Sequence, residues 1–90
     1  MQLLILDDRD NVAIATVDLH TGDRATVAGT SLVLRDNVMR GHKVALRPLP
    51  AGTDVLRYGE VIGASTADIE IGEHVHVHNL ISKRLPGRAQ

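Results

Sequence analysis

The sequence predicts a small, mainly β domain with short strands. Its apolar residues form short runs rich in valine, isoleucine and leucine, which are typical of strands. No window keeps the helical period of about 3.6 residues over three turns. Glycines recur between the apolar runs, so we expect tight glycine turns and at most one or two short helical turns.

The expected strands follow one another closely along the chain. They comprise residues 3–6, 12–17, 25–27, 31–34, 44–46, 55–58, 61–62 and 73–78. The third and fourth flank Gly29-Thr30, which predicts a hairpin. Pro48 and Pro50 stop any helix after the fifth strand. Residues 35–40 lack strand character, and we expect one short helical turn there.

A short repeat supports the all-β prediction. Its copies at 19–25, 49–55 and 69–75 each have an aliphatic residue, a glycine three positions later and an apolar residue three positions after the glycine. In each copy an acidic residue follows the glycine by one or two positions. A glycine turn that leads into a strand explains this pattern, which is too short for a solenoid.

Length and composition indicate one domain, which we place at residues 1–82, followed by a flexible polar tail at 83–90. Tyr58 is the one aromatic residue, so the core is built from Val, Leu, Ile and Ala and gains from packing against a partner. The formal charge is −1 with interleaved signs, and nucleic-acid binding is not expected.

The composition also limits the possible chemistry and location. Because cysteine is absent, disulfides and thiolate zinc sites are excluded, and His, Asp, Glu, Asn or backbone oxygen must hold any metal. The N-terminal apolar run is short and has no basic flank, so it predicts neither a signal peptide nor a membrane span. We therefore expect a soluble cytoplasmic protein.

The run His74-Val75-His76-Val77-His78-Asn79 is the most informative candidate site. On a strand, its three imidazoles share one face and the valines the other. Such a face suits a metal site or proton transfer near neutral pH, although a solvated strand with chance histidines has the same pattern. Same-face neighbours lie about 7 Å apart, so a shared metal needs converging side chains or ligands from elsewhere.

Three other segments contain candidate functional groups. Gly41-His42-Lys43 offers an imidazole and a cation for a carboxylate or sulfonate, or it is an ordinary turn with a solvated lysine. Tyr58 offers a phenol that binds substrate or acts as an acid, or it lies at the edge of the core. Asp7, Asp8 and Asp10 lack calcium-loop spacing and are expected to form an exposed acidic turn.

A series of motifs along the chain indicates a family. They lie at residues 10–13, 41–52, 58–63, 66–69 and 72–80, and together they span roughly residues 9–81. In this order they resemble the SAF-type domain of the altronate/galactarate dehydratase family. That domain is either the N-terminal part of a long sugar-acid dehydratase or a free small subunit paired with a large one, as in sulfolactate sulfo-lyase.

The resemblance implies a β-clip fold, a long bent hairpin folded over itself. It also implies a lyase that removes water, or sulfite in the sulfo-lyase branch, from a hydroxy acid after a proton next to the carboxylate is abstracted. A divalent metal such as iron(II) neutralises charge on the carboxylate in such enzymes. For this chain it implies a small subunit that is inactive until a large subunit completes the site. A homo-oligomer also remains open.

The family motifs fall on five residues of this chain. The Gly-His-Lys element gives His42 and Lys43, and the His-x-His-Asn element gives His76, His78 and Asn79. The resemblance implies catalytic roles for the three histidines and Lys43, and metal binding by His76 and His78. It also implies that Lys43 and Asn79 bind the hydroxy-acid substrate.

Two further points complete the hypotheses. His74 ranks below His76 and His78, because its position often differs within the family. The alternative function is a non-catalytic SAF-type binding or oligomerisation module, similar to antifreeze proteins and to the C-terminal domain of sialic-acid synthase. In that case the histidines are surface or interface residues.

Overall fold

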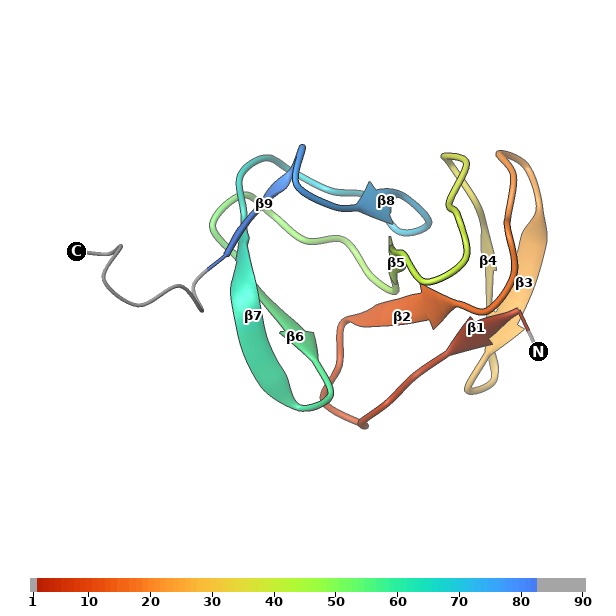
Figure 1. Cartoon of the computed structure of the whole chain (residues 1–90), viewed down its shortest axis with the longest axis horizontal. Helices are drawn as coiled ribbons and strands as arrows, with labels where there is room; N and C mark the ends of the chain where they lie inside the picture. The colour runs from red at the N-terminus through yellow and green to blue at the C-terminus, as the bar shows by residue number, and fades with distance from the viewer. Residues whose placement is uncertain (1, 83–90) are drawn as a thin grey trace.

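The computed structural model describes residues 2–82, so the predicted tail at 83–90 lies outside the described residues. Every regular element in this part of the chain is a strand, which confirms the predicted mainly β class (Figure 1). Residues 2–82 therefore contain no helix long and apolar enough to cross a membrane.

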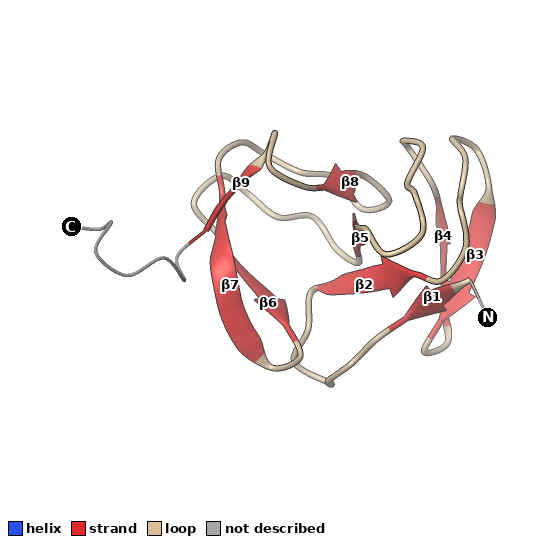
Figure 2. Ribbon diagram, viewed as in Figure 1, coloured by secondary structure: helices blue, strands red, loops and turns tan. Residues whose placement is uncertain are grey.

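Nine strands in residues 2–82 form three small antiparallel sheets. The largest sheet has the order β1 (Leu3–Leu4), β2 (Val12–Ala15), β5 (Lys43–Ala45) and β8 (His74–Val75). A hairpin of β3 (Arg24–Val27) and β4 (Thr30–Val33) forms the second sheet, and β6 (Asp54–Arg57), β7 (Glu60–Ser65) and β9 (Leu80–Ser82) form the third. The two hairpins lie at opposite ends of the molecule in Figure 2.

The four-stranded sheet has an apolar core on each side. Ala13 and Val44 face each other across β2 and β5 and belong to the core that includes Leu32 of β4. The neighbouring residues in sequence point the other way. Of these neighbours, Val12 and Ala45 join a second core with Leu49, Val55, Ile69 and Val75. One thin sheet therefore supports both hairpins.

Four loops that share the same pattern of residues and backbone conformation lie between the strands of these sheets. Each has an aliphatic residue in an isolated β-bridge and, three positions later, a glycine with positive φ: Leu19 and Gly22, Val38 and Gly41, Leu49 and Gly52, Ile69 and Gly72. Three of these loops are the predicted repeat. The fourth was not predicted, and the helical turn expected at 35–40 is wrong. Val38 instead exchanges two backbone hydrogen bonds with Leu19, at 2.8 and 2.9 Å.

In residues 73–82 the observed strands differ from the predicted ones. Pairing at the expected strand 73–78 stops at Val75, and β9 was not predicted. Residues 76–79 form a turn, in which the Asn79 N–H donates to the His76 carbonyl at 3.0 Å. A strand longer than His74–Val75 is therefore ruled out for the histidine run.

Asp10 is buried, which corrects the expectation of a wholly exposed acidic turn. Only 2% of its surface is exposed. Its two carboxylate oxygens accept the N–H groups of Tyr58 and Gly59, each at 2.8 Å. Next to it, Asn11 donates to the Asp54 carbonyl and accepts the Leu56 N–H, at 2.9 and 2.8 Å. These two side chains fasten the β6–β7 hairpin to the segment before β2.

Candidate metal centre

Four imidazoles gather where β5 and β8 pair. His42 immediately precedes β5, His74 begins β8, and His76 and His78 follow in the turn. The His42 ring centroid lies 5.1 Å from that of His74 and 4.5 Å from that of His76. The His74 centroid lies 5.4 Å from that of His76 and 5.3 Å from that of His78. The turn, not a straight strand face, brings the rings together.

The backbone around Gly41 sets the place of His42. Gly41 has φ of 89°, a conformation that favours glycine. Its N–H donates to the Ala15 carbonyl at 2.8 Å, and the His42 carbonyl accepts the Ala15 N–H at 2.9 Å. These two bonds extend the pairing of β2 with β5 by one step and hold His42 beside β8.

Three of the histidines meet the spacing of a metal site. One ring nitrogen each from His42, His74 and His76 lies within 4.8 Å of the others. The His42 Nδ1 and His74 Nε2 atoms are 2.9 Å apart and share one hydrogen bond. Imidazole nitrogens bind zinc and similar divalent ions at about 2.1 Å, so ligands of one ion are about 3 to 3.5 Å apart. Small ring movements suffice to reach that geometry.

The surroundings favour neutral imidazoles. Burial lowers the pKa of His74, and the neighbouring His42, His78 and His76 rings lower it further, while Asp36 opposes them. Burial also lowers the pKa of His76, with smaller contributions in the same direction from His42, Lys43 and His78. A neutral imidazole has the lone pair that a metal needs, so the cluster is suited to a cation.

Lys43 follows His42 and pairs with Val75, so its side chain points to the face of the sheet opposite to Val44 and His74. It is partly buried at the start of β5. Burial and the nearby Arg57 cation lower the pKa of its ammonium group. Its charge in turn contributes to the lowered pKa of His76. Lys43 is therefore a partly buried cation adjacent to His42 in sequence, on the other face of the sheet from His74.

The other predicted site residues have different positions. Asn79 is 8% exposed, and its amide bonds to the backbone of its own turn. His78 touches the His74 ring but is outside the set of three. Tyr58 is 70% exposed in the β6–β7 turn, which lies on the other side of β2 from β8 (Figure 1). The structure thus does not bring Tyr58 to the histidines.

The sequence arguments ranked His74 below His76 and His78 and did not single out Asp36. His74 contacts each of the other three clustered imidazoles. The Asp36 carboxylate accepts the His74 backbone N–H at 3.0 Å. For His42, the repeat was an available signal. Val38 and Gly41 are spaced as in the other copies, which places His42 in the same kind of loop.

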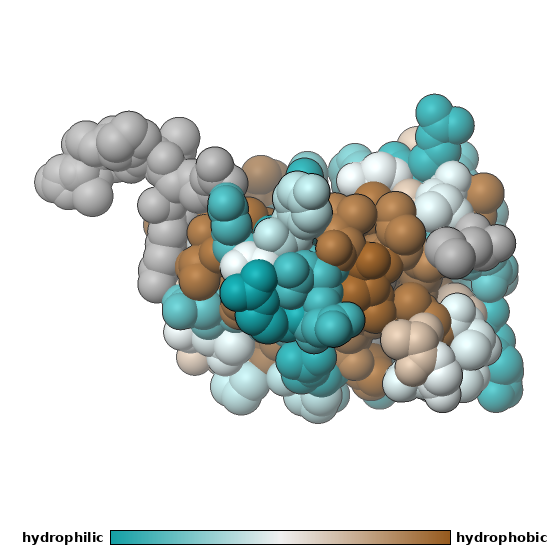
Figure 3. Space-filling model, turned by 90° about the horizontal axis from the view of Figure 1, so that it is seen from below, coloured by the Kyte–Doolittle hydropathy of each residue, from teal (hydrophilic) through white to brown (hydrophobic). Residues whose placement is uncertain are grey.

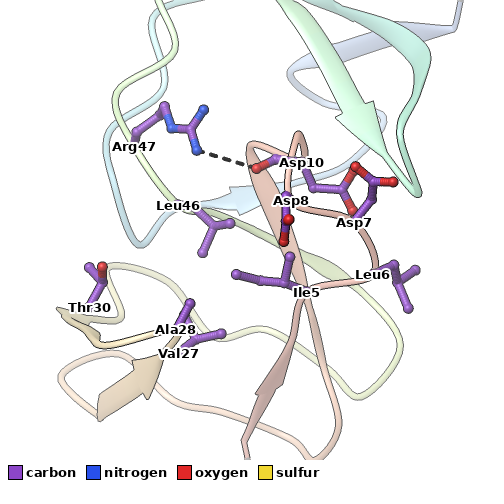
Figure 4. Close-up of a pocket in the computed structure, with 10 residues that line it drawn as sticks. All are labelled: Ile5, Leu6, Asp7, Asp8, Asp10, Val27, Ala28, Thr30, Leu46 and Arg47. Carbon is purple, nitrogen blue, oxygen red and sulfur yellow. Dashed lines mark hydrogen bonds between the residues drawn. The ribbon is translucent and has the colours of Figure 1, made fainter.

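A separate hollow of about 450 Å³ lies between the 5–10 segment, the β3–β4 turn and the end of β5. Ile5, Val27 and Leu46 converge in it, and Asp8 and Arg47 lie at its edge (Figure 4). Figure 3 shows hydrophobic side chains gathered on this face beside a hydrophilic group. None of the clustered histidines lines the hollow, so it is distinct from the candidate metal centre.

Comparison with known proteins assigns most of the chain to one family. A sequence model described as the altronate/galactarate dehydratase SAF domain matches residues 1–83. The altronate dehydratase of Escherichia coli (strain K12) is 44% identical over 79 residues, which cover 88% of this chain and 16% of that protein. The altronate dehydratase of Bacillus subtilis (strain 168) is 42% identical over 71 residues, which cover 79% and 14%.

A third relative is much shorter. The (2R)-sulfolactate sulfo-lyase subunit alpha of Paracoccus pantotrophus is 47% identical over 53 residues, which cover 59% of this chain and 79% of that subunit. This chain therefore matches only 14–16% of the length of the two altronate dehydratases, but most of the length of a separate subunit.

Proposed function

This chain belongs to the altronate/galactarate dehydratase SAF domain family, and from that premise we propose that it is the small component of a hydroxy-acid lyase. Its role is to supply a metal centre and a cation to a site shared with a larger catalytic polypeptide. The observation that carries the proposal is the convergence of three imidazoles, from His42, His74 and His76.

The donor set fits a divalent ion such as iron(II). His42, His74 and His76 are the residues that would hold it, and when bound it supplies Lewis-acid stabilisation of charge on the substrate carboxylate. Three protein ligands leave coordination positions for substrate. This assignment adds His42 and His74 to His76 and removes His78 from the predicted ligand pair.

The remaining residues have roles in substrate binding and proton transfer. Lys43 binds a second anionic group of the substrate, since it is partly buried and directly follows His42 in the chain. The reaction removes a proton from the carbon next to the carboxylate and releases water or sulfite from the neighbouring carbon. His78 is outside the set of three and next to His74, so it is our candidate for moving that proton.

A larger polypeptide completes the enzyme in this proposal. The altronate dehydratases are several times longer than the matched segment, and the sulfo-lyase relative is called a subunit. His42, His74 and His76 are all partly exposed, which leaves them accessible to a second polypeptide. The predicted cytoplasmic location is retained as part of the proposal.

Metal binding by the purified chain tests the proposal. After treatment with a chelator, the protein is titrated with Co²⁺ under anaerobic conditions, with calorimetry and visible absorption as readouts. We expect one ion per chain, and loss of binding in His42→Ala, His74→Ala and His76→Ala. The control is His20→Ala, because His20 lies in the Gly22 loop, outside the cluster. Unchanged affinity in the three cluster variants would contradict the proposed centre.

The separate hollow, which both apolar and charged side chains line, favours a second candidate function, a non-catalytic binding or oligomerisation module. Its lining, which includes Ile5, Val27 and Leu46, is remote from the histidines and open to a partner. Sedimentation of the metal-free chain over a range of concentrations separates the two functions. Self-association that Leu46→Asp abolishes, together with no Co²⁺ binding, would favour the module.

A further inference from the structure

The peptide groups of His74 are held by side chains on both sides. Its N–H donates to Oδ2 of Asp36 at 3.0 Å, and its carbonyl accepts a hydrogen bond from Nδ2 of Asn79 at 2.9 Å. The Asn79 Oδ1 atom also accepts the N–H of His76 at 2.9 Å. Two side chains thus fix the backbone that carries two of the three imidazoles.

The Asp36 side of this arrangement is tightly fitted. The Arg35 N–H donates to the Gly72 carbonyl at 2.9 Å, so residues 35–36 run beside 72–74. A Cβ atom at Gly72 would lie 2.2 Å from the Val33 carbonyl oxygen, which leaves no room for a side chain. The same connection continues through Gly41 to His42, the third imidazole. Asp36 therefore ties the two limbs of the cluster together.

The Asn79 side closes the turn that returns His76 toward His42. Asn79 is nearly buried, and its amide bonds to backbone groups at both ends of the 74–76 segment. Because the donor and the acceptor belong to one planar group, the spacing between the His74 carbonyl and the His76 N–H is fixed. The His74 and His76 rings that this turn carries are nearly parallel, at 12°.

We propose that Asp36 and Asn79 are positioning residues for the metal centre, which act by fixing the backbone of His74 and His76 and do not contact the ion. The inference rests on the proposed function and assigns Asn79 a different role from the predicted substrate ligand. Groups that orient metal ligands typically change metal affinity by about 10- to 100-fold when removed. We expect losses of at least about 10-fold for Asp36→Ala and for Asn79→Ala.

The test compares Co²⁺ affinity and absorption of these two variants with a conservative and a matched variant. Asp36→Asn keeps an oxygen that accepts the His74 N–H, so its affinity is expected to stay close to that of the unmodified protein. Asn37→Ala is the matched control. Asn37 neighbours Asp36, and its side-chain oxygen accepts the Thr21 N–H at 2.9 Å. The substitution therefore removes a similar hydrogen bond at a place away from the histidines. Its stability is expected to fall while Co²⁺ affinity is unchanged.

The outcomes separate this inference from the proposed function. If the unmodified protein binds no Co²⁺, the proposed centre fails. If it binds and Asp36→Ala and Asn79→Ala bind equally well, the positioning role is overturned while the centre stands. Equal losses in Asp36→Asn and Asp36→Ala would overturn it too, since charge and not the hydrogen bond would then matter. Should Asn79→Ala not fold, the comparison of the three variants at Asp36 and Asn37 decides.

Discussion

At the scale of single residues, the protonation of His74 and His76 links the cluster to stability. Both have a pKa below the ordinary value of 6.5, first because of burial. The unfolded chain therefore binds more protons than the folded chain as the pH falls through about 6.5. The stability associated with the neutral rings is complete above this pH and is lost as the pH falls toward the lowered pKa values.

We therefore expect the free energy of unfolding to be lower at pH 5.5 than at pH 7.5. Urea unfolding of the metal-free protein at several pH values in this range measures the effect. The double variant His74→Gln, His76→Gln removes the two titrating groups and should flatten the dependence. His20→Gln should keep it. A dependence that is identical in the double variant would place its origin elsewhere.

Asp10 shows a different use of charge at the residue scale. Its buried carboxylate accepts the N–H groups of Tyr58 and Gly59. Asp10→Ala leaves both donors without this partner and is expected to lower the free energy of unfolding by about 3 kcal/mol. Asp8→Ala is the control, since Asp8 has no hydrogen-bonding partner within residues 2–82, and a change of about 0.5 kcal/mol or less is expected. Chemical denaturation measures both, and similar losses would refute the argument.

These residues also show what the sequence was able to reveal. The meeting of His42 with His76 was indicated by their motifs. The burial of Asp10 and the backbone hydrogen bonds of Asn79 were not predicted, because a polar side chain that bonds to backbone is identical in sequence to one that faces a ligand. Only the path of the chain decides between these uses.

At the scale of elements, the glycine loops hold the short strands in place. The repeat predicted three of them from the spacing of aliphatic residue and glycine. The copy at Val38 was not recognised in the sequence, because His42 and Lys43 occupy the positions where the other copies have an acidic residue. The length of the strand that became β8 was overestimated for a related reason. The alternation of histidine and valine suits a strand, but the Asn79 side chain and backbone stabilise a turn instead.

Two of these glycines allow a matched comparison. Gly52 and Gly72 have φ of 85° and 89° in equivalent loops. A Cβ atom at Gly52 would meet nothing within 4 Å, whereas one at Gly72 would strike the Val33 carbonyl. Gly52→Ala should cost about 1–2 kcal/mol through backbone strain alone. Gly72→Ala should cost about 3 kcal/mol or more, because β4 and the loop must also separate.

Thermal and urea unfolding of the two variants measure this difference. The Gly72→Ala protein should also bind Co²⁺ more weakly, since the displaced loop leads directly into His74. The Gly52→Ala protein should bind it normally. Equal destabilisation of the two variants would show that the close approach of Gly72 to β4 has no energetic weight.

At the scale of the whole molecule, the fold consists of two similar halves. The segment with Leu19, Gly22 and the β3–β4 hairpin corresponds to the one with Leu49, Gly52 and the β6–β7 hairpin. The equivalent strands β5 and β8 pair symmetrically, with Lys43 opposite Val75 and Val44 opposite His74. The sequence suggested the repeat but not this pairing, which joins residues about 30 positions apart with no local signal.

The symmetric pairing places the candidate metal centre at the junction of the halves. His42 comes from the Gly41 loop, and His74 and His76 follow the equivalent Gly72 loop. An ion held by all three would cross-link the halves in the folded state only. Ligands that bind only the folded state stabilise it, by about 2.7 kcal/mol at one hundred times the dissociation constant. For a domain of this size, that corresponds to a rise in Tm of about 10–20 °C.

Thermal unfolding with saturating Co²⁺ and with excess chelator measures this rise. His76→Ala removes one limb of the cross-link and should abolish most of the shift, while His20→Ala should retain it. Because the ion would join β5 to β8, hydrogen exchange should slow at Val44 and Val75 together and less in the β3–β4 hairpin. A shift of equal size in His76→Ala, or protection confined to one half, would show that the ion does not join the two halves.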